Sequence, residues 1–286
     1  MKAPCPNKEG HSLPSIRKVI RYSVEKPLML QSCFSQFYAG HTITNFVLYP
    51  YGKESHFLKI RELAFRNLKI LPYDTKHQTK KEKRQRMKHF MSTKDIVIAI
   101  HRKGASSRHG QALANVDELA RYFQTHLSNH SFIQQLLNSS NSNNHHSQQQ
   151  MHRKLKIQVI ELHQFNTIAS QIEYFSQVDI YISDPGSAAY YAIFMRDETM
   201  MILPPTCHSE TKQCRISHGT FVLSALPNVQ VVEMMEMLLK GVSPECVPKA
   251  LPMNPYNCEV IMPPPLLANA IVRALRRRFR KFVNNV

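Results

Sequence analysis

The stretch IVIAIHRKGASSRHGQALANVDEL, residues 96–119, joins a run of apolar residues to a cluster of cations and then to the start of a helix. Ile96–Ile100 is apolar throughout and rich in β-branched residues, which is typical of a strand covered on both faces, as in a parallel sheet. Asn115 is a residue type that caps helices, and two acids follow it in the expected first turn. We therefore predict a strand, a loop and a helix that begins near Val116.

The loop between this strand and this helix has the composition of an anion pocket. Arg102, Lys103 and Arg108 supply positive charge, and the small residues Gly104–Ser107 allow the backbone to come close to a ligand. Ligands of open α/β sheets bind at the carboxyl ends of strands, where this loop is expected. A phosphate or diphosphate is the expected ligand. The alternative is a solvated basic loop, because Arg and Lys are mostly surface residues in any fold.

Strands and helices are expected to alternate from Asp95 onward. The hydrophobic pattern predicts further strands over residues 155–162, 179–183, 199–203 and 229–232. It predicts helices over residues 116–127, 168–176, 187–195 and 266–283. Strands that alternate with helices in this way indicate an α/β fold with a Rossmann-like parallel sheet.

The chain is expected to divide into unequal parts. These are a partial N-terminal, acceptor-side segment over 1–75, a basic linker over 76–94 and a sheet domain over 95–286. A helix is predicted over 56–71, with Ile60 and Leu63 on its apolar face and Arg61 turned away from that face. Residues 139–150 consist almost wholly of Ser, Asn, His and Gln, so we expect a disordered insertion that cannot bury a core.

The formal charge of +17 looks like a nucleic-acid signature until the charges are located. Residues 76–88 hold seven Lys or Arg against one Glu, and residues 273–281 hold six with no acid. The charge is thus concentrated in the expected linker and the terminal helix. No nucleic-acid partner is expected, and nucleic-acid binding remains the less favoured alternative. The terminal helix presents either a solvated Arg-rich face or a surface for anionic membranes.

A second turn with ligand-binding character is expected at the sequence SDPGSAAY, residues 183–190. It lies between a predicted strand and a predicted helix, so Gly186 and Ser187 would present backbone N–H groups at a positive helix terminus. Asp184 is either a general base, or a partner of a sugar hydroxyl, or a structural turn residue. Ser187 could also simply cap the helix. The turn is therefore a second candidate anion site on the same sheet edge.

The cysteines and two glycosylation sequons bear on the compartment. Cys207 and Cys214 are expected to form a disulfide or to be two free thiols, since the spacing of the Cys and His residues here matches no standard zinc site. Sequons begin at Asn129 and Asn138, and they have meaning only in a secretory lumen. No window has the apolar length of a membrane helix, and the first 30 residues lack the core of a signal peptide.

At its two candidate anion sites the chain resembles glycosyltransferase family 61. That family includes the EGF-domain O-linked N-acetylglucosamine transferase, the protein O-mannose N-acetylglucosaminyltransferase and plant xylan-decorating enzymes. Its members carry a strand followed by S-R-x-x-x-x-R and then N-x-x-E-L, for which the counterparts here are Arg102, Arg108, Asn115, Glu118 and Leu119. Their V-x-E-L strand and G-x-H-G-A-x-L-x-N-x-x-F-M turn are similar to Val159–Leu162 and Ile182–Met195.

The resemblance implies a GT-B-like fold in the lumen of the Golgi or the endoplasmic reticulum. It implies transfer of a GlcNAc or pentose-type sugar from a UDP-sugar donor to a protein or glycan acceptor, with no metal or other cofactor required. Arg102, Lys103, Ser107 and Arg108 would bind the donor diphosphate. Gly186 and Ser187 would hold the rest of the donor, and Asp184 is the only nearby candidate for a catalytic residue.

One departure from the family pattern limits what the resemblance implies. The family's His-Gly-Ala is replaced by Pro185, Gly186 and Ser187, and its later Asn corresponds to Tyr191. Because that histidine contributes to donor binding or catalysis in the family, the alternative function is that of an inactive relative that acts as a binding or scaffold module. Any membrane contact would involve the basic terminal helix or an anchor absent from this chain.

Overall fold

A parallel five-stranded sheet forms the centre of the computed structural model. The structure describes residues 54–70, 95–104, 111–138, 153–184, 186–208, 210–211, 213–215, 223–224, 226, 228–234, 245–248 and 258–283. All of these residues belong to one compact unit, Thr44–Val286. The expected basic linker and the expected disordered insertion lie outside the described residues.

The strands of the central sheet follow the spatial order β3-β1-β4-β5-β8. Every neighbouring pair in it is parallel. The strands are β1 (Ile96–His101), β3 (Leu155–Ile160), β4 (Ile180–Ile182), β5 (Thr199–Leu203) and β8 (Val229–Glu233). All five were predicted, with ends that differ by one or two residues, so the α/β class with a parallel sheet is confirmed.

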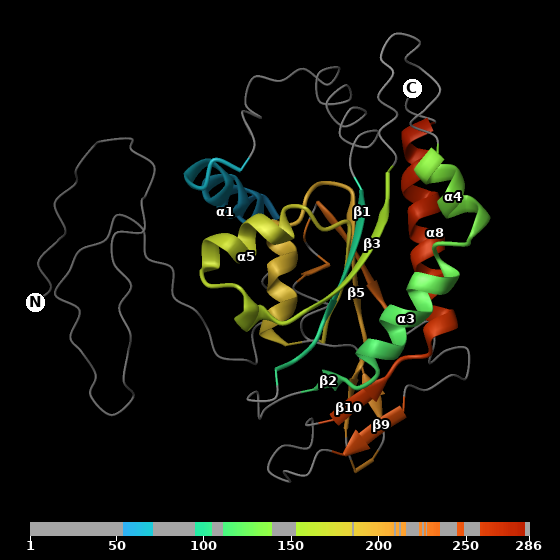
Figure 1. Cartoon of the computed structure of the whole chain (residues 1–286). Helices are drawn as coiled ribbons and strands as arrows, with labels where there is room; N and C mark the ends of the chain where they lie inside the picture. The colour runs from blue at the N-terminus through green and yellow to red at the C-terminus, as the bar shows by residue number, and fades with distance from the viewer. Residues whose placement is uncertain are drawn as a thin grey trace, which may run out of the picture. The chain divides into compact units, whose positions relative to one another are not determined.

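Helices cover both faces of this sheet (Figure 1). One face carries α3 (Val116–His126), α4 (Ser131–Asn138) and α8 (Pro264–Val283). The other carries α1 (Glu54–Asn67), α5 (Ile168–Phe175) and η4 (Ser187–Phe194). Alternate residues of β1 feed the two apolar cores, because Ile96, Ile98 and Ile100 point to one face while Val97 and Ala99 point to the other.

The direction of the connections changes between β1 and β4. The chain leaves β1 toward the face of α3 and α4 and enters β3, and it leaves β3 toward the face of α5 and enters β4. The strand order therefore reverses at the neighbouring strands β1 and β4. In open α/β sheets such a reversal opens a crevice at the carboxyl ends of the two strands, where ligands bind.

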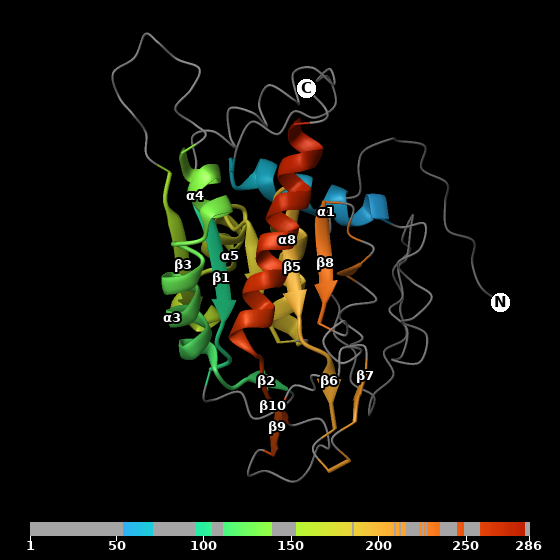
Figure 2. The same ribbon diagram turned by 90° about the vertical axis from the view of Figure 1, so that its right-hand side faces the viewer.

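Two small sheets lie beyond the carboxyl ends of the central strands (Figure 2). In one, β10 (Cys258–Ile261) pairs with β2 (Ala112–Leu113) and with β9 (Glu245–Pro248). In the other, β6 (Thr206–Cys207) pairs with β7 (Cys214–Arg215). The Pro-rich stretch 244–265, whose sequence indicates an extended or looped conformation, thus contains two short paired strands, β9 and β10.

The β6–β7 hairpin is closed by a disulfide between Cys207 and Cys214. Of the alternatives left open by the sequence, the disulfide is the one confirmed. Cys258 is disulfide-bonded as well, and no described cysteine is a free thiol.

Removal of the hairpin disulfide is expected to destabilise the fold moderately. A bridge that closes a loop of this length contributes about 2–3 kcal/mol, chiefly by restricting the unfolded chain. Cys207→Ser/Cys214→Ser should lower the free energy of unfolding by that amount in urea titration of the oxidised protein. Under reducing conditions the difference between the variant and the wild type should shrink, and a difference that persists unchanged would assign the loss to packing of the buried Cys207 instead.

Helix α1 differs from its prediction in the residues that it buries. Arg61, expected on the solvent side, is 3% exposed, and its guanidinium donates to the carbonyl of Met195 at 3.0 Å and pairs with Asp197 at 2.8 Å. Ile60 and Leu63, expected on the buried side, are exposed. The structure thus groups α1 with the sheet domain, whereas the sequence assigned it to the segment 1–75.

Candidate functional site

Two of the strands that meet at the reversal point end in ionisable side chains. His101 is the last residue of β1, and Asp184 follows β4 by two residues. The His101 Nδ1 and Asp184 Oδ1 atoms are 2.6 Å apart, and the side chains are only 7% and 4% exposed. The pair joins neighbouring strands through residues that are 83 positions apart in the chain. A hydrogen bond of this kind fixes both side chains at the carboxyl ends of β1 and β4.

Gly186 lies directly against the Asp184 carboxylate. A Cβ atom at position 186 would be 2.7 Å from Asp184 Oδ2, which is closer than folded proteins allow. The backbone at residue 186 has φ −94°, which any residue can adopt. A glycine is favoured here because there is no room for a Cβ atom, and not because the backbone conformation is unusual. The D-P-G-S turn therefore requires a residue without a side chain at this point, which the sequence did not reveal.

The turn ends at the start of η4, with Gly186 at the N-cap position and Ser187 in the first turn. The sequence predicted a helix over 187–195, and the structure shows a 3₁₀ helix over Ser187–Phe194. Tyr181, on β4, donates from its hydroxyl to the carbonyl of Ala188 at 3.1 Å. Burial raises the pKa of Tyr181, so the phenol stays a neutral donor that ties η4 to the strand.

Tyr191, which the resemblance to glycosyltransferase family 61 matches to an Asn, makes contacts that stabilise the fold. Its hydroxyl donates to the side-chain oxygen of Gln171 on α5, and its ring stacks on Phe175 at 4.9 Å between centroids. Burial raises the pKa of Tyr191, so it also remains neutral. The residue thus holds η4 against α5.

Arg102 and Lys103 follow His101 at the same edge, and both have partners within the fold. Arg102 pairs with Asp117 of α3, and its other guanidinium nitrogen is 3.9 Å from the Glu161 carboxylate. Lys103 Nζ donates to the backbone carbonyl of Gln111 at 3.1 Å. The Arg102 side chain keeps 38% of its surface exposed, which leaves it open to an additional anion. The other predicted donor-binding residues of this loop, Ser107 and Arg108, lie outside the described residues.

The buried amide of Gln111 joins this edge to the β6–β7 hairpin. Its Nε2 donates to the carbonyl of Pro205 at 2.6 Å, and its Oε1 accepts from the backbone N–H of Cys207 at 2.8 Å. Sequence reasoning missed this residue, because nothing in the local pattern indicates which glutamine is buried. Gln111 thus connects the residue before β2 to the segment that joins β5 to β6.

Asn115 differs from its predicted role as a helix cap. Its side chain makes no capping hydrogen bond to the backbone of α3. Instead, Asn115 Nδ2 donates to the Met262 carbonyl and to Glu118, and Oδ1 accepts from the Met262 N–H at 3.0 Å. Asn115 therefore connects the start of α3 to the segment that precedes α8.

His101 was also missed as a candidate. The sequence placed it at the end of a buried strand and directly before two cations, which is a position where a histidine commonly faces a ligand site. Its partner could not be read locally, since Asp184 comes to it only through the pairing of β1 with β4.

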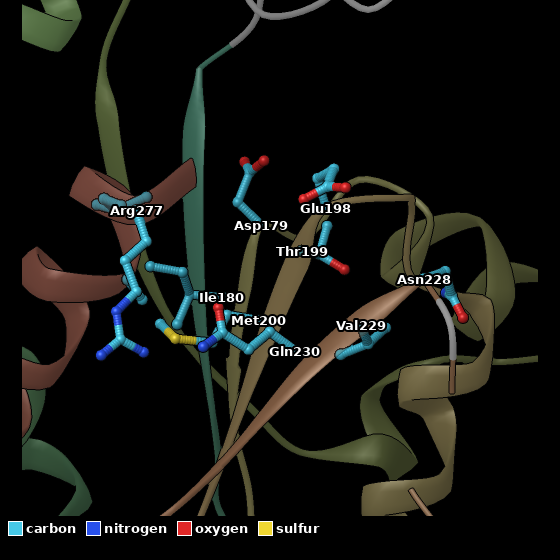
Figure 3. Close-up of a pocket in the computed structure, with 11 residues that line it drawn as sticks. Asp179, Ile180, Glu198, Thr199, Met200, Asn228, Val229, Gln230 and Arg277 are labelled. Atoms are coloured by element: carbon cyan, nitrogen blue, oxygen red, sulfur yellow. The ribbon is translucent and has the colours of Figure 1, made fainter. Parts of the chain in front are cut away.

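A pocket lies at the opposite edge of the sheet, at the amino ends of β4, β5 and β8 (Figure 3). It has a volume of about 360 Å³, and Arg277 of α8 and Glu198 lie on its rim. Three other polar side chains in its lining serve the fold. Asp179 pairs with Arg196, Thr199 donates to the Arg196 carbonyl, and Asn228 donates to the Met195 carbonyl.

The described part of the chain offers neither a metal cluster nor a membrane-spanning helix. No three His, Cys, Asp or Glu side chains there come together to hold a metal ion. None of the helices described is both long and apolar enough to cross a membrane.

Comparison with known proteins does not identify a family. No protein-family model matches the chain, and no curated protein sequence matches it.

Proposed function

We propose that this protein binds a nucleotide sugar at the carboxyl ends of β1 and β4, as a glycosyltransferase-like protein of GT-B type. The observation that carries the proposal is the meeting of His101 with the Asp184–Gly186 turn at the point where the strand order reverses. The same two segments carry the resemblance to glycosyltransferase family 61, although they are far apart in the sequence. Their contact in space is what a single ligand site would require.

Cations and backbone N–H groups at this edge suit a diphosphate. Arg102 follows His101 in the chain and is part-exposed, and the N–H groups at the start of η4 have no partners within that helix. Lys103 and the predicted donor-binding residue Arg108 are in the same loop. In a site without a metal, fixed cations and backbone N–H groups would stabilise the departing diphosphate, which is the main contribution expected of them.

A lumenal location is part of the proposal. The Cys207–Cys214 disulfide and the disulfide-bonded Cys258 suit an oxidising compartment. Asn129 and Asn138, which begin the two sequons, are both exposed, as glycosylation requires.

Calorimetric titration with UDP-GlcNAc, UDP-xylose and UDP tests the proposal. We expect the wild type to bind at least one of them, and Arg108→Ala to weaken that binding by about tenfold to a hundredfold, because a charged hydrogen bond contributes about 1.5–3 kcal/mol. The matched control is Arg277→Ala, which removes an exposed guanidinium from the opposite edge and should leave binding unchanged. Absence of binding by the wild type, or a loss with Arg277→Ala alone, would contradict the proposal.

A second function, that of a binding module without turnover, is favoured by one observation. Asp184, the only catalytic candidate from the sequence, is 3% exposed, and its carboxylate is bonded to His101. One oxygen of this carboxylate is engaged by His101 and the other lies against Gly186, so Asp184 is poorly placed to act on an acceptor hydroxyl itself. Release of UDP from a bound UDP-sugar, with water or an acceptor peptide, decides between the two functions.

A further inference from the structure

We propose that His101 is the general base of this site and that Asp184 is its positioning residue. This inference rests on the nucleotide-sugar function proposed above and names the group that would act in it. The chain has Pro185 where the resembling family has a histidine. The structure brings a different histidine, from β1, to the same turn.

The geometry assigns different roles to the two members of the pair. A carboxylate accepts hydrogen bonds, so His101 donates from Nδ1, and in the neutral imidazole the lone pair of the ring is then on Nε2. Among the described residues, only Nδ1 of this ring has a hydrogen-bond partner. The imidazole retains 7% exposure. Nε2 is therefore the atom that can face a bound hydroxyl.

Asp184 is suited to orient His101. One carboxylate oxygen accepts from Nδ1, and the other lies against Gly186, where no side chain would fit. The charge of Asp184 also stabilises the imidazolium that forms when Nε2 takes a proton. We thus replace the sequence-based assignment of Asp184 as the base with a positioning role.

The other ionisable groups at this edge are less suited to act as the base. Glu161, after β3, lies near Arg102 and 3.3 Å from His163, and its carboxylate also caps the 3₁₀ turn η3 (Leu162–Gln164). His163 is 68% exposed and sits on a surface turn, so its position is not fixed in a crevice. Lys103 and Arg102 are cations and cannot accept a proton.

The proposed step balances as follows. The oxygen of an acceptor hydroxyl attacks the anomeric carbon of the UDP-sugar, and the proton of that hydroxyl passes to Nε2 of His101. The bond between the anomeric carbon and the diphosphate oxygen breaks, and UDP leaves with the electron pair. His101 then returns its proton to solvent, so the products are the glycosylated acceptor, UDP and one proton.

The test compares UDP release from UDP-GlcNAc, or from the UDP-sugar that binds best, by wild type and His101→Gln. We expect His101→Gln to bind the donor as the wild type does and to lower kcat by at least about a hundredfold, the usual contribution of a general base. Asp184→Asn should lower kcat and change the pH profile of kcat, because it removes the carboxylate that orients the imidazole and stabilises the imidazolium formed in the reaction. His163→Gln is the matched control and should change neither. Thermal melts confirm that each variant is folded.

A second measurement keeps the proposal testable without turnover. Nitrogen-15 NMR of histidine-labelled protein should show His101 with a protonated Nδ1 and an unprotonated Nε2, and the Nε2 signal should move when the UDP-sugar is added. Three results would overturn this inference and leave the proposed function standing. They are the opposite tautomer of His101, an unchanged kcat in His101→Gln, and a wild type that binds the donor without turnover. A wild type that binds no nucleotide sugar would overturn the proposed function and this inference with it.

Discussion

Asp179→Ala is expected to lower the free energy of unfolding by about 3–5 kcal/mol, because it leaves a buried cation without its counter-ion. Asp179 and Arg196 are 6% and 8% exposed and are joined at 3.0 Å. The second Asp179 oxygen accepts from the backbone N–H of Val97 at 3.0 Å. The residue thus ties the amino end of β4 to β1 and to the segment before β5.

Urea titration of three variants checks this expectation. Asp179→Asn keeps an acceptor for the Val97 N–H and should lose less stability than Asp179→Ala. Asp179→Ala/Arg196→Met removes both charges and should also lose less than Asp179→Ala, since no unpaired cation remains. The matched control is Asp117→Ala, which breaks an exposed pair with Arg102 and should cost at most about 1 kcal/mol. Equal losses in Asp179→Ala and Asp117→Ala would show that burial of the pair contributes nothing.

Gly186→Ala is expected to disable the candidate site while leaving the protein folded. The added methyl group would be 2.7 Å from Asp184 Oδ2, so the carboxylate must move away from His101 or the turn must open. Overpacking of this kind costs about 1–3 kcal/mol of stability. The turn carries Asp184, the partner of His101, and it leads directly into η4. A displaced turn should therefore lower the affinity for a nucleotide sugar by at least about tenfold.

The control for Gly186→Ala is another glycine at the same edge. A Cβ at Gly104 would meet His163 Nδ1 at 3.4 Å, which is an ordinary contact. Gly104→Ala should therefore lower stability much less than Gly186→Ala in thermal melts, while calorimetry measures the UDP-sugar affinity of Gly186→Ala. If Gly186→Ala binds the nucleotide sugar as well as the wild type does, the turn is not part of the site.

The strands were predictable because their signal is local. Ile96–Ile100 and 199–203 are apolar at nearly every position, and only strands buried on both faces tolerate that composition. The cations after β1 and the small residues after β1 and β4 were recognisable in the sequence. They follow the carboxyl ends of these strands, where the candidate site is proposed.

The side-chain partners were not predictable because they are set by the topology. His101 and Asp184 meet only because β4 pairs with β1, although β3 lies between them in the sequence. Arg61 is buried because it finds Asp197 and the Met195 carbonyl, while the helical periodicity of α1 indicated the opposite face. Such contacts join segments that are far apart in the chain, and local patterns carry no information about them.

A crystal structure of the protein grown with UDP or a UDP-sugar tests the central claim most directly. We predict that the diphosphate lies at the carboxyl ends of β1 and β4, against Arg102 and the N–H groups at Gly186 and Ser187, with a hydroxyl-bearing group facing His101. A nucleotide bound instead in the pocket beside Arg277, at the amino ends of the strands, would contradict the proposed site. Crystals grown at a saturating concentration of nucleotide would also contradict it if they contained no nucleotide while the carboxyl ends of β1 and β4 were accessible to solvent.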